Sequence, residues 1–530
     1  MSHDRSIRKQ GFLQGTAILT AGILISKVIG ALFKIPLTRL ITTEGAGHFA
    51  VAYNIYIVLL NVAASGLPIA VSRMISQAGA LGNRRQIRRI HHTSLGLFLV
   101  IGLISSGATL LFSPQIARWM RDPDAVYAIA ALSPAVLFVC VYSAFRGYFQ
   151  GQQYMSPTAK AQVLEACSKL FIGLAAAILA LRAGWSYPKV AGASILGVTV
   201  GAVLSCLYFI GQYRSRRVTV GAEDAGQTVT SVGRTVKEIL WLAVPITIGA
   251  TGFQIFNVLG NKVILGQLQD SLHLTLEQAT SQLGIYTNAQ TLYLLPSAIV
   301  QPLAISIVPA ITEALSLCNT GECRRKTESA VRITGLIAIP CGVGLSVLSG
   351  PIQGLIYGYD AATKAAAAPV LAVLGIASIL YCFVLVTNAI LQANGKVYFS
   401  IYTTLAGGIA SLVTTHLLVG NSRLRITGAA IGALAYCLVA VSMNFRAIAR
   451  LSDHPRLLPQ LYKTALAAAA MGAAAGAVFL AVHNTILAIG AAVIVYAALV
   501  WGLRVLTWYD CTLLPSGQKI AKLLRIRPEA

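Results

Sequence analysis

Charged residues are scarce in this sequence: they make up 11% of its 530 residues, and only 17 residues are Asp or Glu. Soluble domains average about 25% charged residues, so the composition excludes an ordinary soluble domain. Long polar blocks are missing too, because apolar runs of about 20 residues recur from end to end. The sequence therefore predicts an all-α polytopic membrane protein.

Several motifs of catalysis and metal binding are absent as well. There is no GxxxxGK[ST] loop for ATP, and the eight histidines include no HExxH arrangement. The nine cysteines are scattered, with no CxxC and no Cys/His cluster, so neither a metal site nor a disulfide is expected. The carboxylates between the apolar runs form no acid/base pair. We therefore expect a transporter without a cofactor, and Na⁺, H⁺ or the membrane potential stay open as its driving force.

Apolar runs bounded by helix-breaking residues give the predicted membrane topology. The N-terminal MSHDRSIRKQ is basic, but the run behind it is long, contains lysines and meets another span at once, so no cleavable signal peptide is expected. Fourteen transmembrane helices are predicted near 13–41, 47–76, 93–114, 125–149, 158–182, 187–212, 237–266, 283–314, 329–350, 365–392, 397–420, 425–449, 461–483 and 485–508.

Lys and Arg are distributed unequally between alternate connections. One side holds 28 of them and the other side holds 8. By the positive-inside rule the richer side is cytoplasmic, which places both termini in the cytoplasm. This bias explains most of the net charge of +24. Anionic membrane lipids are therefore expected as partners, and nucleic acid is not.

Two segments of the sequence resemble each other without a gap. LPIAVSRMISQAGALGNRRQIRR, from Leu67, aligns with LAISIVPAITEALSLCNTGECRR, from Leu303, so that Asn83 falls on Asn319. We therefore expect two six-helix lobes in a pseudo-twofold parallel repeat, which usually place the substrate near the midplane and work by rocking. The predicted parts are an N-lobe over 1–220, a C-lobe over 221–455, and two appended helices with a cytoplasmic tail over 456–530.

Polar residues within the apolar runs are the candidates for a substrate site. Lys27 and Lys34 are seven residues apart and project from nearly the same face of the first helix, and Arg73 lies in the second. Buried cations are costly in a membrane, and neither helix carries a carboxylate within its apolar run to neutralise them. We therefore predict that these cations bind a visiting anion. Further substrate-binding candidates, for which interhelical contacts or snorkelling to lipid headgroups stay open, are Asn54, Asn61, Asn257, Asn261 and Lys262.

Two other features predict structural or gating roles. Glu165 and Lys169 have the i,i+4 spacing of an ion pair, and a pair that joins helices is favoured over a substrate site. Pro68 is expected to kink the second helix.

The stretch FRGYFQGQQYMSPTAKAQVLE, residues 145–165, resembles a known family, and KIPLTRL and ASGLPIAVSRMISQ in the first two helices agree. The family is the stage V sporulation protein B and MurJ-like branch of the multidrug/oligosaccharidyl-lipid/polysaccharide (MOP) exporter superfamily. The resemblance covers essentially the whole chain. Arg146 and Gln150 belong to the shared motif, and we add them to the structural or gating group.

What the resemblance implies is a flippase. It would move undecaprenyl-diphosphate-linked sugars, such as the peptidoglycan precursor lipid II, from the inner to the outer leaflet by alternating access. In that family, basic residues of helices 1, 2 and 8 bind the diphosphate, and Lys27 and Arg73 match the first two. The chain departs from the family at Thr291, where lipid II flippases carry an arginine, and at Gly260, where an aspartate is frequent. These departures bear on lipid II as the cargo rather than on the transport class.

The expected ligand is thus a polyprenyl-diphosphate glycolipid, and cell-wall synthesis proteins are further candidate partners. Three other functions stay open. A cation-coupled multidrug exporter would share the fold but is expected to keep unpaired carboxylates in its cavity. A membrane-embedded glycan transferase or ligase would form new covalent bonds. A non-transporting scaffold for envelope or spore assembly would not depend on its buried lysines.

Overall fold

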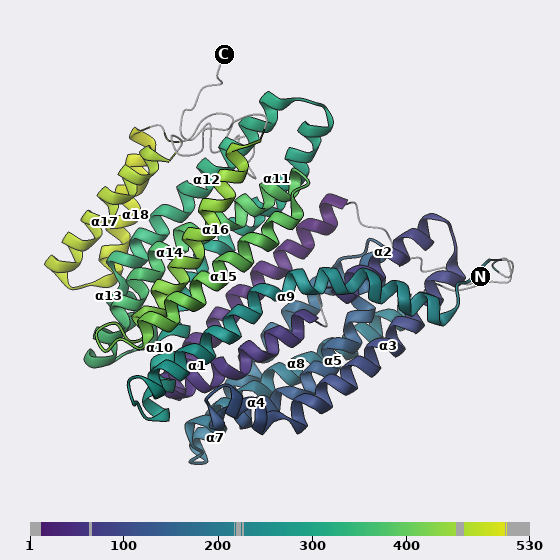
Figure 1. Cartoon of the computed structure of the whole chain (residues 1–530), viewed down its shortest axis with the longest axis horizontal. Helices are drawn as coiled ribbons and strands as arrows, with labels where there is room; N and C mark the ends of the chain where they lie inside the picture. Colours follow the sequence, from purple (N-terminus) through teal and green to yellow (C-terminus); the bar gives the residue numbers. More distant parts are fainter. Residues whose placement is uncertain are drawn as a thin grey trace. The chain divides into compact units, whose positions relative to one another are not determined.

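A computed structural model gives the arrangement of the helices in space. It describes residues 12–62, 66–216, 218, 224, 227–451, 461–503 and 505. Every regular element in this described part is a helix (Figure 1). Twelve of the described helices are long and apolar enough to cross a membrane. The prediction of an all-α polytopic membrane protein is therefore confirmed, and its count of fourteen spans is compatible with this structure.

The chain divides into two compact units. The first unit comprises Met1–Gln269 and His273–Gly284, and the second comprises Asp270–Leu272 and Ile285–Ala530. The helix α10 (Leu276–Tyr293) therefore begins in the first unit and continues into the second.

In the first unit, α5 packs against α2, α3 and α8 (Figure 1), and α6 packs against α1 and α8. Helices dominate because a membrane interior offers no water to satisfy backbone N–H and C=O groups. The helices of this unit are α1 (Phe12–Asn61), α2 (Leu67–Ala80), α3 (Arg84–Leu111), α4 (Ser113–Trp119), η2 (Pro123–Ala125), α5 (Val126–Gly151), α6 (Ser156–Ser168), η3 (Lys169–Gly173), α7 (Leu174–Arg182), α8 (Tyr187–Arg216) and α9 (Val232–Asp270).

The helix α1 contains a break that separates two predicted spans. Thr42 lies inside it with φ of 61° and ψ of −174°, which is not helical. Within the second predicted span, α1 ends at Asn61 and α2 begins at Leu67, and Val62 and Gly66 next to these ends are π-helical. Pro68 stands in the first turn of α2, where a proline is tolerated since its missing N–H has no helical partner there. The kink expected at Pro68 stays a prediction, because residues 63–65 lie outside the described residues.

A π-helical turn interrupts the span that contains Glu165. The helix is continuous from Ser156 to Arg182, but residues Lys169–Gly173 form the π-helix η3. Such π-helical turns are rare in proteins, and those that occur are often found at functional sites.

In the second unit, α14 packs against α11, α12 and α16, while α17 contacts α12 and α18. Asn319 caps α12 by accepting a hydrogen bond from Glu322 N at 3.0 Å. Asn83 caps α3 in the same way, from Gln86 N at 2.9 Å. The two asparagines aligned in the sequence thus have the same role. The remaining helices are α11 (Leu295–Ser316), α12 (Thr320–Val347), α13 (Ser349–Tyr357), α14 (Ala361–Ala393), α15 (Val397–Val419), α16 (Thr427–Ala449), α17 (Tyr462–Val482) and α18 (Thr485–Gly502).

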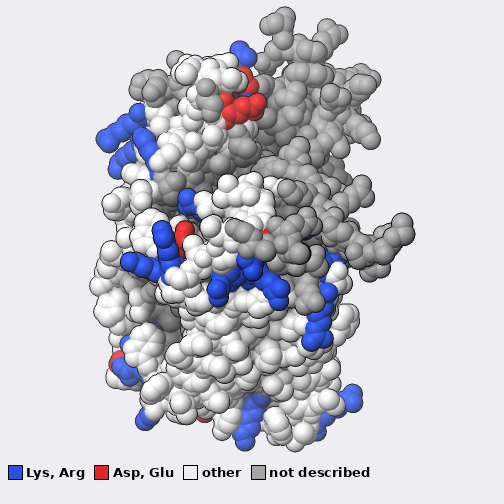
Figure 2. Space-filling view, turned by 90° about the vertical axis from the view of Figure 1, so that its right-hand side faces the viewer, with Lys and Arg blue, Asp and Glu red and all other residues white. Residues whose placement is uncertain are grey.

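The basic excess is visible on the molecular surface. The face drawn in Figure 2 shows far more Lys and Arg than Asp and Glu side chains, separated by uncharged areas. Uncharged surface of this extent suits contact with lipid, since many large apolar side chains on the helices are exposed.

Candidate functional site

A cavity of about 600 Å³ lies inside the first unit, between α1, α2, α5, α6, η3 and α8. Its lining contains three cations, Lys27, Arg146 and Lys169, and one carboxylate, Glu165. With these groups ionised, the lining has two positive charges in excess. An excess of positive charge inside a membrane protein marks the cavity as a candidate functional site.

Two helices supply most of the polar groups of the cavity. On each of them the polar residues recur at intervals of three or four and therefore share a face. Since α5 and α6 follow one another as membrane-crossing helices, they run in opposite directions, and the two polar stripes meet in reverse order. The stripes consist of Tyr142, Arg146 and Gln150 on α5, and of Thr158, Gln162, Glu165 and Lys169 on α6 and η3.

Glu165 and Lys169 form an ion pair at one end of the stripes, with Lys169 Nζ 3.6 Å from Glu165 Oε1. The Tyr142 hydroxyl donates to Glu165 Oε2 at 3.2 Å. Lys169 Nζ also donates to the Tyr53 hydroxyl at 3.3 Å and lies 5.5 Å from the centre of that ring. Tyr56 is buried and interacts electrostatically with the same carboxylate. The pair therefore joins α6 and η3 to both α1 and α5.

The structure brings together seven of the thirteen residues that the sequence nominated. Those that line the cavity are Lys27, Asn61, Pro68, Arg146, Gln150, Glu165 and Lys169. The residues found outside its lining are Lys34, Arg73, Asn54, Asn257, Asn261 and Lys262.

Asn54 and Asn257, two nominated residues outside the lining, both contact Gln254 of α9: Asn54 from α1, and Asn257 from α9 itself. Gln254 Nε2 donates to Asn54 Oδ1 at 3.3 Å, and Asn257 Nδ2 lies 3.4 Å from Gln254 Oε1. The Lys262 ammonium lies 4.0 Å from the centre of the Trp119 ring, a cation–π contact with α4.

The other three nominated residues outside the lining differ in burial. Asn261 is buried, and its amide nitrogen has no hydrogen-bond partner in the described part of the chain. Arg73 is exposed on α2, and Lys34 is half-buried on α1, two turns beyond Lys27.

Sequence reasoning missed the tyrosines of the cavity. Tyr142 stands one turn before Arg146 and on the same face, so the spacing could have indicated it. Tyr53 gives no such signal, because only the packing of α1 against η3 brings it to Lys169.

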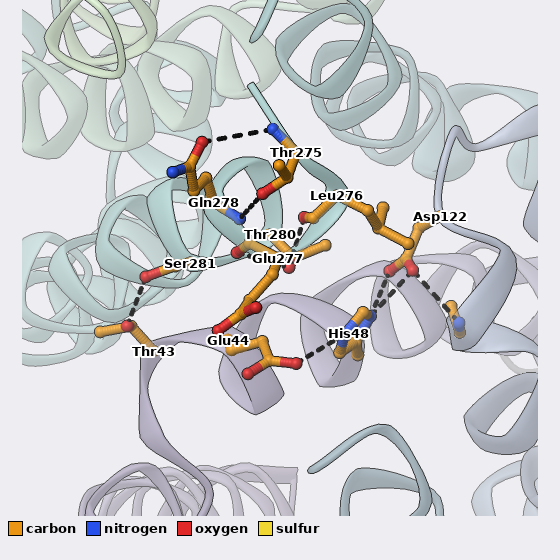
Figure 3. Close-up of polar contacts among 11 residues, drawn as sticks. Thr43, Glu44, His48, Asp122, Thr275, Leu276, Glu277, Gln278, Thr280 and Ser281 are labelled. Atoms are coloured by element: carbon orange, nitrogen blue, oxygen red, sulfur yellow. Dashed lines mark hydrogen bonds and ion pairs between the residues drawn. The ribbon is translucent and has the colours of Figure 1, made fainter. Parts of the chain in front are cut away.

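A second polar cluster surrounds His48, apart from the cavity lining (Figure 3). His48 Nδ1 lies 2.8 Å from both carboxylate oxygens of Asp122, and His48 Nε2 is 3.9 Å from Glu44 Oε1. The hydroxyl oxygens of Thr43 and Ser281 are 2.6 Å apart. The cluster thus connects the break in α1 with the turn before η2 and with the start of α10, all within the first unit. In the described part of the chain, no group of three or more His, Cys, Asp or Glu is arranged to hold a metal ion.

The chain is similar to known membrane proteins. The family model described as polysaccharide biosynthesis protein matches residues 12–315, more than half of the chain. The lipid II flippase MurJ of Bacillus subtilis (strain 168) is 27% identical over 415 residues, covering 76% of this chain and 76% of that protein. Stage V sporulation protein B of the same organism is 27% identical over 425 residues, or 80% of each chain. A solved structure of lipid II flippase MurJ in an inward closed conformation shares the fold, with a TM-score of 0.69 and 13% identity over 91% of this chain and 98% of that one.

Proposed function

Because the chain belongs to the polysaccharide biosynthesis protein family, in the stage V sporulation protein B and MurJ-like branch of the MOP exporter superfamily, we propose that it is a flippase for a polyprenyl-diphosphate-linked sugar. It moves this lipid from the inner to the outer leaflet of the bacterial cytoplasmic membrane by alternating access. The observation that carries the proposal is the cavity in the first unit, whose lining has an excess of positive charge.

The charge of the cavity suits a diphosphate. Each of the two phosphate groups that link a polyprenol to a sugar carries a negative charge near neutral pH. Lys27 and Arg146 both line the cavity, and we assign the diphosphate to them. A guanidinium matches the geometry of phosphate oxygens, and an ammonium adds a compact charge.

The other cations of α1 and α2 are assigned to the approach of the headgroup. Lys34 continues the face of Lys27, and Arg73 is exposed on α2. We assign to both the attraction of the anionic headgroup before it enters, while the polyprenyl chain stays in the lipid. Binding of the anion removes the cost of buried positive charge, which favours the change between inward-facing and outward-facing states.

The same cavity argues against the multidrug exporter. A cation-coupled exporter of cationic drugs is expected to offer an unpaired carboxylate, whereas Glu165 is engaged by Lys169 and Tyr142. An excess of positive charge also repels a cationic drug.

Native mass spectrometry of the purified protein tests the proposal. We expect a co-purifying polyprenyl-diphosphate glycan that is lost from a Lys27→Met, Arg146→Met double variant. The matched control is Lys189→Met, because Lys189 lies outside the lining, 5.6 Å from the Tyr127 ring centre. A protein that binds no polyprenyl diphosphate, but does bind cationic dyes, would overturn the flippase in favour of the drug exporter.

A further inference from the structure

Three buried polar atoms on the cavity residues have no hydrogen-bond partner among the residues that the structure describes. They are Arg146 Nε, Thr158 Oγ1 and Gln162 Oε1. Thr158 is only 1% exposed. Buried polar groups are nearly always hydrogen-bonded in folded proteins, so a group of three on one cavity wall calls for an explanation.

The three atoms lie on the facing stripes of α5 and α6. Thr158 and Gln162 are one helical turn apart and share a face, and the reversed order of the stripes sets Arg146 against the Gln162 turn. Glu165 and Lys169 follow along the same face and are engaged with each other. From Thr158 to Lys169 the helix rises about 16 Å. The wall therefore has a charged end near Lys169 and an uncharged hydrogen-bonding end near Thr158.

The chemistry of the uncharged end differs from that of a phosphate site. A phosphate oxygen only accepts hydrogen bonds here, but Gln162 Oε1 is itself an acceptor and needs a donor from its ligand. Sugar hydroxyl and N-acetyl groups supply donors for Gln162 and acceptors for Arg146, and the Thr158 hydroxyl can do either.

We propose that Arg146, Thr158 and Gln162 form a subsite for the sugar of the transported lipid, next to the diphosphate. This inference rests on the proposed function, which it deepens: the uncharged end of the cavity selects for a sugar on the diphosphate. Arg146 lies where the two parts meet and contacts both.

Binding of bare and of sugar-bearing lipid probes tests the subsite. The probes are undecaprenyl diphosphate and the same lipid carrying either N-acetylglucosamine or galactose, titrated against protein in lipid nanodiscs. We expect the unmodified protein to bind at least one sugar-bearing probe more tightly than the bare lipid. Thr158→Val and Gln162→Met should each weaken the binding of the sugar-bearing probe by about 5- to 10-fold, the effect of one lost hydrogen bond. Each variant should bind the bare lipid with an affinity within about twofold of that of the unmodified protein.

The matched control is Thr109→Val, because the Thr109 hydroxyl donates to the Ser105 carbonyl of its own helix α3, outside the cavity. It should leave both probes unchanged. Binding of the bare lipid also reports whether each variant is folded.

Three results would overturn the subsite. The first is that neither sugar increases the affinity of the unmodified protein for the lipid. The second is that the Thr158 and Gln162 variants bind the bare and the sugar-bearing lipid equally more weakly. In both cases these residues do not bind the sugar, although the flippase proposal stands. If the unmodified protein binds neither the bare nor the sugar-bearing lipid, the proposed function fails and the subsite fails with it.

Discussion

The imidazole Nδ1 of His48 lies 2.8 Å from each carboxylate oxygen of Asp122, and both side chains are buried. The two residues are 74 positions apart. Asp122 Oδ1 also accepts a hydrogen bond from Ala125 N at 3.3 Å and so begins the helix η2. This carboxylate therefore holds a turn and a distant helix in place at once.

We expect Asp122→Ala to destabilise the protein strongly. The substitution leaves the His48 imidazole buried without its acceptor, and loss of one member of a buried pair typically costs about 3–5 kcal/mol. Thermal unfolding of the detergent-solubilised protein measures the effect. Asp124→Ala is the control, since Asp124 is exposed two residues away; equal melting temperatures for the two variants would contradict a stabilising role for the pair.

Gly47→Ala and Gly284→Ala should each disturb the contact between α1 and the start of α10. A Cβ at Gly47 would overlap the Thr280 carbonyl, and one at Gly284 would overlap the Thr43 carbonyl. Because backbone atoms cannot move aside as a side chain can, we expect a loss of about 1–3 kcal/mol in each variant.

The control for the glycine variants is Gly107→Ala on α3, where a Cβ meets nothing within 4 Å. Its folded yield, measured by size-exclusion chromatography, should equal that of the unmodified protein. Monodisperse Gly47→Ala protein with an unchanged melting temperature would show that the helices are not held this closely.

Lys27→Ala should abolish complementation of a flippase-deficient strain without loss of membrane insertion, because it removes a cation from the cavity lining. Arg73→Ala should have the same result if Arg73 attracts the headgroup. Lys27→Arg is the matched variant that keeps the charge, and we expect it to retain activity. Full activity of both alanine variants would reject the anion site.

Glu165→Gln should strengthen the binding of undecaprenyl diphosphate by several-fold, because Lys169 then lacks its carboxylate and the positive charge of the lining rises. The gain should shrink as salt is added. Titration at low and at high salt measures both effects. Unchanged or weaker binding would mean that Glu165 does not limit the charge of the cavity.

Lys169→Met should lower the stability of the protein. It leaves Glu165 in the cavity wall without its ion-pair partner, which we expect to cost about 3 kcal/mol. The double variant Glu165→Gln, Lys169→Met should recover most of that loss, and the difference gives the coupling energy of the pair. Additive losses in the double variant would show that the two residues act independently.

Much of the site could be predicted from residues close together in the sequence. The i,i+4 spacing indicated the Glu165–Lys169 pair, and the basic residues of the first helix indicated Lys27. Contacts between distant segments could not be predicted in this way. The His48–Asp122 pair carries no local pattern, and the Tyr53 contact with Lys169 depends on how α1 is rotated against η3.

The sequence by itself determined that this chain is an all-helical membrane protein of a transporter family, because apolar content over about 20 residues and short motifs are local properties. Only the tertiary structure decided which polar residues share a cavity. Successive residues of a helix point about 100° apart, so a small change in helix rotation decides whether a side chain faces the cavity, a neighbouring helix or lipid. For this reason Lys27 and Arg146 line one cavity while Arg73 does not.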